Sequence, residues 1–207
     1  MKHFIWDFDG MLFDTYPHTL AAFCETCRRF GVPYEEDEVF AHLKVTVWHA
    51  LTFYGFDAEM KAAFYALEND LDYLPRGKPY PMIPHILEQI VNNGGKNYLY
   101  THRDRVAVRY LERYGLEELF ADAVTRELGF PHKPAPDAIE YLVQKHGLPK
   151  DECLMLGDRL IDIGSGRNAG VHTCLFDEFG DLPETECDYR CRTTEELSGM
   201  VEMMIGG

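Results

Sequence analysis

Three carboxylates lie near the N-terminus, in a segment that otherwise has the character of a buried strand. Residues 4–15 read FIWDFDGMLFDT, so Asp7 and Asp9 follow an apolar run directly and Asp14 comes later. A carboxylate can attack phosphorus and form an aspartyl-phosphate, and a second acid can move protons to the leaving group and from the attacking water. The pair Asp7 and Asp9 thus has the groups that phosphoryl transfer needs, although an isolated Asp-x-Asp-Gly more often caps a strand and starts a turn. Asp14 and Thr15 are more typical of a helix start.

Polar residues also follow, or lie close to, later apolar segments of the chain: Thr101, His102 and Arg103, then Lys133, then Asp158 and Asp162. Open parallel sheets bind ligands at the carboxyl ends of their strands, so these residues are expected to converge on Asp7 and Asp9. Converging carboxylates repel one another unless a cation lies between them, and Mg²⁺ prefers such oxygen ligands and recruits substrate phosphates. We expect Asp7, Asp9 and Asp158 to hold this metal.

The neighbouring residues offer what phosphoryl transfer requires around the transferred oxygens. Thr101 supplies a hydroxyl and Lys133 a compact cation. Gly10 permits a sharp turn after the strand, which lets backbone N–H groups face a phosphate. His102 and Arg103 are candidates for substrate contact, although Arg103 is equally compatible with an ion pair to a surface acid.

The pattern of apolar residues indicates the elements that position this set. Buried strands are expected at 3–8, 96–100, 153–157 and 172–176, with a weaker one at 123–127. Helices are expected at 83–93, 104–114, 136–146 and 160–169, and a closing helix from Glu195 onward. This alternation predicts a parallel sheet with helices on both faces.

One segment interrupts the alternation. Between Pro17 and about Tyr73, apolar residues recur at helical spacing, which predicts helices at 17–30, 35–43, 46–54 and 57–73. The prolines of PRGKPYPMIP, residues 75–84, then predict a linker. The expected fold class is α/β: a Rossmann-like parallel-sheet core, formed by 1–15 and 82–207, with an all-helical cap inserted at 16–81.

Composition limits the class of partner and the location. The 207 residues carry a formal net charge of -15, which repels nucleic acid and anionic membranes. The chain contains no apolar run of the roughly 18–20 residues that a membrane helix needs, and it begins unlike a signal peptide, so we expect the cytoplasm. The spacing of Cys24, Cys27, Cys187 and Cys191 allows a zinc site, but helical patterning and the absence of turn residues favour reduced thiols in the core.

The segments DFDGMLFDT, YTHR, HKPAPD and LMLGDRLIDIGSGRNAG resemble, in order, the four motifs of the haloacid dehalogenase superfamily, over nearly the whole chain. The resemblance implies that Asp7 is the nucleophile and Asp9 the general acid/base, with the Asp9 carbonyl on Mg²⁺. It implies contacts for the other motif residues: Thr101 and Lys133 on the phosphate, Asp158 on the metal, and Asp162 on the metal or just behind it. The helical insert resembles the small cap of the branch that contains phosphoglycolate phosphatase and β-phosphoglucomutase.

The sequence departs from the family pattern at two places beside the cap. Met11 stands where threonine or valine is usual, and Met82 where glycine is usual. These differences bear on the hinge of the cap rather than on the chemistry. Within the cap, HLKVTVWHAL at 42–51 places Lys44 between two helical patterns, where related caps have a loop that closes over the substrate. Lys44 is thus a candidate for substrate binding, and a solvated lysine is the alternative.

Together these features predict a Mg²⁺-dependent phosphatase that acts on a small phosphorylated metabolite, as a monomer or homodimer, with no nucleic-acid or membrane partner. A sugar phosphomutase of the same branch is the nearest alternative. Two further alternatives are a carbon–phosphorus hydrolase, in which Lys44 would form a Schiff base, and a non-catalytic protein of the same fold. A dehalogenase is disfavoured, because its chemistry needs neither Mg²⁺ nor an acid at position 9. The substrate itself does not follow from the sequence.

Overall fold

The computed structural model describes residues 1–74, 76–180 and 182–206, so residue 75, the first of the predicted linker, lies outside the described part. The chain forms two compact units. Met1–Phe13 and Pro79–Gly207 make up the first, called the core unit below, and Asp14–Lys78 the second, called the helical unit. No helix in the described ranges is both long enough and apolar enough to cross a membrane.

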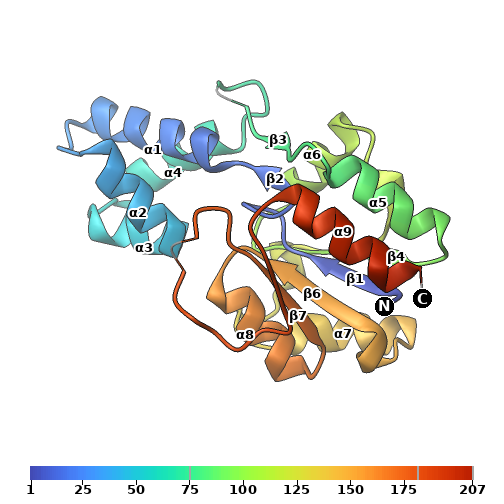
Figure 1. The fold of residues 1–207 in the computed structure, drawn as a ribbon. Helices are drawn as coiled ribbons and strands as arrows, with labels where there is room; N and C mark the ends of the chain where they lie inside the picture. The colour runs from blue at the N-terminus through green and yellow to red at the C-terminus, as the bar shows by residue number, and fades with distance from the viewer. Residues whose placement is uncertain (75, 181, 207) are drawn as a thin grey trace. The chain divides into compact units, whose positions relative to one another are not determined.

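A single six-stranded sheet is the centre of the core unit (Figure 1). Its strands are β1 (His3–Trp6), β4 (Lys96–Tyr100), β5 (Phe120–Val124), β6 (Cys153–Gly157), β7 (His172–Phe176) and β8 (Tyr189–Cys191). They lie in the order β5-β4-β1-β6-β7-β8, and every neighbouring pair is parallel. The central strands are buried on both faces, which explains why they appear in the sequence as continuous apolar runs.

Helices cover both faces of this sheet, as the alternation of elements predicts (Figure 1). On one face α5 (Ile83–Asn92) packs against β4 and against α9 (Thr194–Ile205). On the other face α7 (Asp137–His146) packs against α8 (Leu160–Ala169), which covers β6 and β7. The remaining elements of this unit are α6 (Val106–Arg113) and the short 3-10 turns η1 (Glu117–Leu119), η2 (Arg126–Leu128) and η3 (Lys150–Glu152). The predicted α/β class is confirmed.

Apolar side chains fix α7 to the sheet. Ile139 and Leu142 of this helix are fully buried in one cluster with Tyr98 of β4 and Met155 of β6. Each such side chain contributes about 1.5–3 kcal/mol when it leaves water completely. This packing sets the position of the loop that precedes α7, which carries Lys133.

The order of the strands creates one natural binding position. From β1 the chain proceeds to β4 and β5 on one side, and then returns to β6 on the other side of β1. At such a reversal the connections leave in opposite directions, and open parallel sheets bind ligands there, beyond the carboxyl ends of the strands. Asp7 follows β1 at this point and is joined to β6 by a 2.9 Å hydrogen bond from its N–H to the Leu156 carbonyl.

The helical unit consists of α1 (Tyr16–Phe30), α2 (Glu36–Val45), α3 (Val47–Phe53) and α4 (Ala58–Glu68). Its own core is aromatic, because the ring of Phe23 stacks on Phe56 at 4.5 Å and meets the edge of Phe64 at 5.8 Å between centroids. Short strands β2 (Phe13–Asp14) and β3 (Lys78–Pro79) lie where the chain passes from one unit to the other.

Several predicted bounds differ from the structure, each for a local reason. The weak strand expected at 123–127 is β5 at 120–124, an edge strand whose residues are mostly half-exposed and therefore give little apolar signal. The helix expected at 57–73 ends at Glu68, because the Asp70 side chain accepts the N–H of Asp72 and forms a turn. The linker expected at 75–84 already includes the start of α5, whose first turn accommodates a proline. Strand β8, which has three residues, was not expected.

Candidate active site

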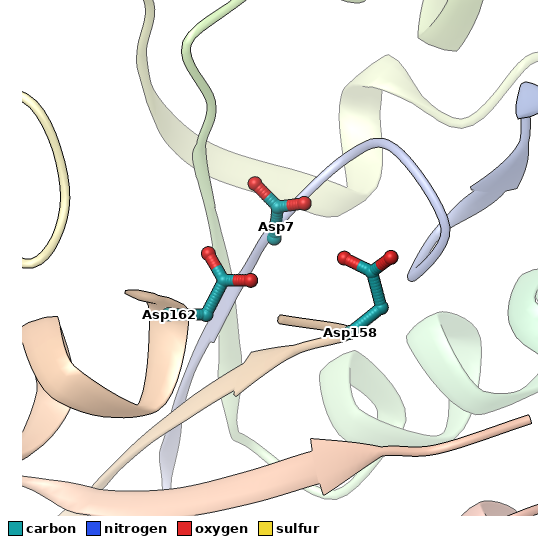
Figure 2. A group of neighbouring side chains, drawn as sticks. All are labelled: Asp7, Asp158 and Asp162. Atoms are coloured by element: carbon teal, nitrogen blue, oxygen red, sulfur yellow. The ribbon is translucent and has the colours of Figure 1, made fainter. Parts of the chain in front are cut away.

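Three carboxylates converge at the reversal point of the sheet. Asp7 follows β1, Asp158 follows β6, and Asp162 lies in the first turn of α8. One oxygen of each lies within 4.8 Å of the others, and Figure 2 shows the three side chains directed toward a common space. Asp7 is only 1% exposed and Asp162 is fully buried. Three ionised carboxylates so close together and so little hydrated need positive charge among them.

Lys133 supplies part of that charge. Its Nζ lies 2.5 Å from Asp7 Oδ1 and 2.7 Å from Asp162 Oδ1, and it also donates to the Tyr100 carbonyl at 3.1 Å. Burial alone lowers the pKa of a lysine, but here the two carboxylates outweigh burial and raise the pKa of Lys133, which therefore remains an ammonium ion. The lysine predicted from its motif thus contacts the predicted nucleophile.

The two oxygens of Asp7 have different surroundings. Oδ1 contacts Lys133, whereas Oδ2 is buried and accepts no hydrogen bond from the described residues. Arg159 Nη2 approaches Oδ2 only to 3.8 Å. Burial raises the pKa of Asp7 to about 6, and the charge of Lys133 acts against this rise. A buried carboxylate oxygen without a donor, beside two further carboxylates, has the chemistry of a site for a hard divalent cation.

Asp9 lies in a tight turn directly after β1. Gly10 has a φ of 74°, a left-handed conformation that favours glycine, and its N–H donates to the Phe13 carbonyl at 2.8 Å. This turn carries the Asp9 side chain, which is paired with Arg103: Arg103 Nε lies 2.8 Å from Oδ1 and 2.9 Å from Oδ2. The turn expected from Gly10 is present. Arg103, a candidate for substrate contact, forms an ion pair with Asp9 in this structure.

Thr101 follows β4 and is 2% exposed. Its hydroxyl oxygen accepts the N–H of Arg103 at 3.0 Å, so the threonine also shapes the turn that carries Arg103. The hydroxyl hydrogen remains available as a donor to a bound anion. Thr101 therefore belongs to the same edge of the sheet as Asp7, as its place after a strand predicts.

His102 is engaged through both ring nitrogens. Its Nε2 accepts the backbone N–H of Lys133 at 3.0 Å, and its Nδ1 lies 3.4 Å from Nδ1 of His132. Burial, together with the positive charge of Lys133, lowers the pKa of His102 to about 3, so the ring is neutral at ordinary pH. In this arrangement His102 links the end of β4 to the loop of Lys133.

Two other residues of the site differ in how the sequence signals them. Arg159 directly follows Asp158, and its Nε lies 3.6 Å from Asp158 Oδ1, so its place beside a candidate metal ligand is a signal in the sequence. Tyr100 contributes its backbone carbonyl and its ring, which lies 4.3 Å from Lys133 Nζ, and no sequence pattern predicts such a contact. Lys44, expected between two helices, lies instead in the last turn of α2 in the helical unit. Its part in substrate binding stays a prediction.

Comparison with known proteins agrees with this geometry. The family model described as haloacid dehalogenase-like hydrolase matches residues 4–176. Phosphoglycolate phosphatase from Aliivibrio fischeri is 26% identical over 197 residues, which cover 84% of this chain and 82% of that protein.

Two solved structures are also similar. A hydrolase from Streptococcus pneumoniae is 32% identical and aligns over 85% of this chain and 94% of that chain, with a TM-score of 0.63. The putative haloacid dehalogenase-like hydrolase YfnB from Bacillus subtilis, described as bound to magnesium, shares the fold with a TM-score of 0.74 at 18% identity, over 97% of this chain and 98% of that one. With motif residues in place at the ends of β1, β4 and β6 and a family match across most of its length, the chain belongs to the haloacid dehalogenase-like hydrolase family.

Proposed function

We propose that this protein is a Mg²⁺-dependent phosphatase that hydrolyses a small phosphomonoester through an aspartyl-phosphate on Asp7. The proposal rests on the environment of Asp7, a buried carboxylate at the reversal point of the sheet. Lys133 contacts one of its oxygens, the other accepts no hydrogen bond from the described residues, and two further carboxylates lie close by. The similarity to a protein named phosphoglycolate phosphatase supports the phosphatase reaction.

The chain offers a suitable site for Mg²⁺. Asp7 and Asp158 would hold the ion through carboxylate oxygens, with Asp162 as a further ligand or behind them, and the Asp9 carbonyl would complete the protein ligands. Three carboxylates face two cations, Lys133 and Arg159, so the cluster retains negative charge that a divalent ion would offset. When bound, Mg²⁺ neutralises charge on the phosphate and so makes attack by a carboxylate feasible. A magnesium-bound neighbour of the same fold is consistent with this choice of metal.

In the first step, one oxygen of Asp7 attacks phosphorus, the bond from phosphorus to the substrate oxygen breaks, and the electron pair of that bond stays on the leaving alcohol. Asp9 gives this alcohol a proton. In the second step, Asp9 takes a proton from water as the water oxygen attacks phosphorus. The bond between Asp7 and phosphorus then breaks, which releases phosphate and restores the carboxylate.

Lys133 and Thr101 have positioning and electrostatic roles in this scheme. The ammonium of Lys133 holds Asp7 in place and remains charged, and we propose that it also stabilises the transferred oxygens as negative charge spreads over them. The hydroxyl of Thr101 donates to the same phosphate. Because Lys133 already contacts Asp7, it needs no rearrangement before the reaction.

We further propose that residues 16–81, which include most of the helical unit Asp14–Lys78, act as a cap that excludes water during attack by Asp7 and admits it for hydrolysis. In this proposal Lys44 contacts the substrate. The substrate is a small phosphorylated metabolite, and the cytoplasm is the proposed location, where thiols such as the six free cysteines stay reduced. A screen of phosphorylated metabolites for phosphate release, run with the wild type and Lys44→Ala side by side, tests the substrate and the role of Lys44 together.

The decisive experiment replaces the nucleophile. Asp7→Asn is isosteric, and we expect it to abolish phosphate release from para-nitrophenyl phosphate and from the best metabolite, while circular dichroism shows an intact fold. Asp151→Asn, at an exposed carboxylate in η3, is the matched control and should keep full turnover. Acid quenching of the wild type during turnover of a ³²P-labelled substrate should trap label on the protein, and Asp7→Asn should trap none. Turnover of the Asp7→Asn variant at the wild-type rate would falsify the proposed nucleophile.

A further inference from the structure

Arg103 and Asp9 form an ion pair at the edge of the proposed active site. The single N–H of Arg103 Nε is shared between the two oxygens of Asp9, at 2.8 and 2.9 Å. The Arg103 side chain is 8% exposed and that of Asp9 26%. A hydrogen bond between charged partners with so little solvent access is stronger than a surface pair and holds the carboxylate in a defined orientation.

Both partners are attached to rigid parts of the core unit. Asp9 lies in the turn closed by hydrogen bonds from Gly10 N–H to the Phe13 carbonyl and from Leu12 N–H to the Phe8 carbonyl. Arg103 is anchored at its backbone, where its N–H donates to the Thr101 hydroxyl at 3.0 Å and its carbonyl accepts the N–H of Arg126 at 2.9 Å.

The guanidinium group is also supported by an aromatic ring. The central carbon of the Arg103 guanidinium lies 5.8 Å from the ring centroid of Phe8, a fully buried residue. Such a contact between a cation and a ring favours one placement of the side chain. Arg103 therefore has a fixed backbone, a packed side chain and a specific partner, which is the arrangement of a residue that holds another residue in place.

We propose that Arg103 is a positioning residue for Asp9, which directs the Asp9 carboxylate toward the oxygen of the leaving alcohol and later toward the attacking water. The inference rests on the proposed function, since it assigns Arg103 to the proton-transfer partner of that reaction and not to the substrate. The Nε–H donates to the carboxylate and takes no proton from it, so the ion pair orients the Asp9 oxygens without doing the proton transfer itself. Loss of Arg103 removes the hydrogen bonds at 2.8 and 2.9 Å and weakens the alignment that proton transfer requires.

This role has a kinetic signature that a substrate contact lacks. When an alkyl phosphate reacts, the electron pair of the breaking bond goes to a strongly basic alcohol oxygen, which needs a proton from Asp9. When para-nitrophenyl phosphate reacts, the phenolate leaves without one. A residue that only positions Asp9 thus matters much more for the first substrate than for the second, and matters little for substrate affinity.

The test measures release of the leaving group in a single turnover by rapid quenching, for the best alkyl phosphate substrate and for para-nitrophenyl phosphate. We expect Arg103→Gln to slow the alkyl substrate by about a hundredfold and para-nitrophenyl phosphate by less than about tenfold, because general acid catalysis is worth at least that factor. KM should change little for either substrate. Arg103→Lys keeps the charge without the planar group and should recover part of the rate with the alkyl substrate.

Arg126→Gln is the matched control, because Arg126 is a half-exposed arginine on the same edge that pairs with Asp104 at 3.1 Å, and it should behave as wild type. Equal slowing of both substrates with a raised KM identifies Arg103 as a substrate ligand and overturns the inference. Equal slowing with unchanged KM and a lowered melting temperature, in both Arg103 variants, also overturns it, since that outcome is purely structural. A wild type that releases no leaving group from any phosphomonoester overturns the proposed function itself, which these other outcomes leave standing.

Discussion

The ammonium nitrogen of Lys133 lies 2.7 Å from Asp162 Oδ1, and neither side chain is exposed to solvent. The same nitrogen lies 2.5 Å from Asp7 Oδ1. One buried cation therefore serves two buried carboxylates that come from different elements, the strand end after β1 and the first turn of α8. Since Asp162 also accepts the N–H of Arg159 at 3.0 Å, it ties the loop after β6 to the lysine, and Lys133 connects three segments of the active site.

Removal of this lysine should destabilise the protein strongly. Lys133→Met leaves Asp7 and Asp162 buried without their shared partner, so we expect a loss of about 3–5 kcal/mol in the free energy of unfolding. Urea denaturation at pH 7 measures it. The double variant with Asp162→Asn should recover part of the loss, because it also removes one of the unpaired charges.

The control for Lys133 is Lys145→Met, at a lysine that is 44% exposed and pairs with Asp122 at 2.7 Å. An exposed pair contributes at most about 1 kcal/mol, so the free energy of unfolding of this variant should be close to that of the wild type. Similar losses in the two lysine variants would contradict a special role for burial at Lys133.

Mg²⁺ should stabilise the folded protein through the acidic cluster. A ligand that binds only the folded state adds about 2.7 kcal/mol at a hundred times its dissociation constant. For a chain of this size, such a gain raises the melting temperature by roughly 5–10 °C. Differential scanning fluorimetry with increasing MgCl₂ measures the shift, and EDTA should reverse it. Asp158→Asn should remove most of the shift, whereas the exposed Asp151→Asn should retain it in full; an equal shift in both variants places the ion elsewhere.

The sequence best predicts the strands that are buried on both faces of the sheet. Strands β4 and β6 lie within the interior of the sheet and match the expected ranges, because both of their faces are apolar. The edge strands β5 and β8 have half-exposed residues, and their hydrophobic pattern is correspondingly weak. The predicted fold is therefore accurate at the centre of the sheet and less so at its edges.

In the site, the residues at the strand ends are easier to predict from the sequence than the contacts between distant residues. Asp7 and Asp158 are predictable because each follows a strand directly, and the ends of parallel strands meet at one edge. The pairing of Arg103 with Asp9 joins residues 94 positions apart, and it depends on the turn of Gly10 and on the packing of Phe8. The turn is predictable from Gly10, but the contact of Phe8 with the guanidinium and the choice of Asp9 as partner are not visible in a local pattern. The sequence consequently identifies the residues of the site better than it identifies their partners.

The stability of the protein should depend on pH through His102. The ordinary pKa of 6.5 is lowered to about 3 in the folded protein, mainly by burial. Between these pH values the unfolded chain binds a proton at His102 that the folded protein does not. The free energy of unfolding therefore rises with pH up to about 6.5, and above that pH the contribution of His102 is complete. The contribution is at most about 1.4 kcal/mol per pH unit.

Urea denaturation from pH 5 to pH 7.5 tests this dependence. His102→Gln retains an oxygen that can accept the Lys133 N–H but does not titrate, so its stability should vary less with pH than that of the wild type. His85→Gln, at an exposed histidine of α5, is the control and should follow the wild-type curve. If His102→Gln and the wild type lose stability in parallel as the pH falls from 6.5 to 5, another group is responsible.

Gly157 should tolerate no side chain, because at the end of β6 the side chain of Asp162 occupies the space that a Cβ would need. A Cβ at position 157 would lie 2.2 Å from Asp162 Cβ and 2.4 Å from its carboxyl carbon, well inside van der Waals contact. Gly157→Ala should therefore displace Asp162 from Lys133, lower the free energy of unfolding by at least about 1–3 kcal/mol and reduce phosphate release. The matched control is Gly199→Ala in α9, where a Cβ meets no atom within 4 Å and the helix should gain roughly 0.5–1 kcal/mol. The two glycine variants should thus shift the urea midpoint in opposite directions, and a Gly157→Ala protein with wild-type stability and turnover would show that Asp162 can move without loss of the site.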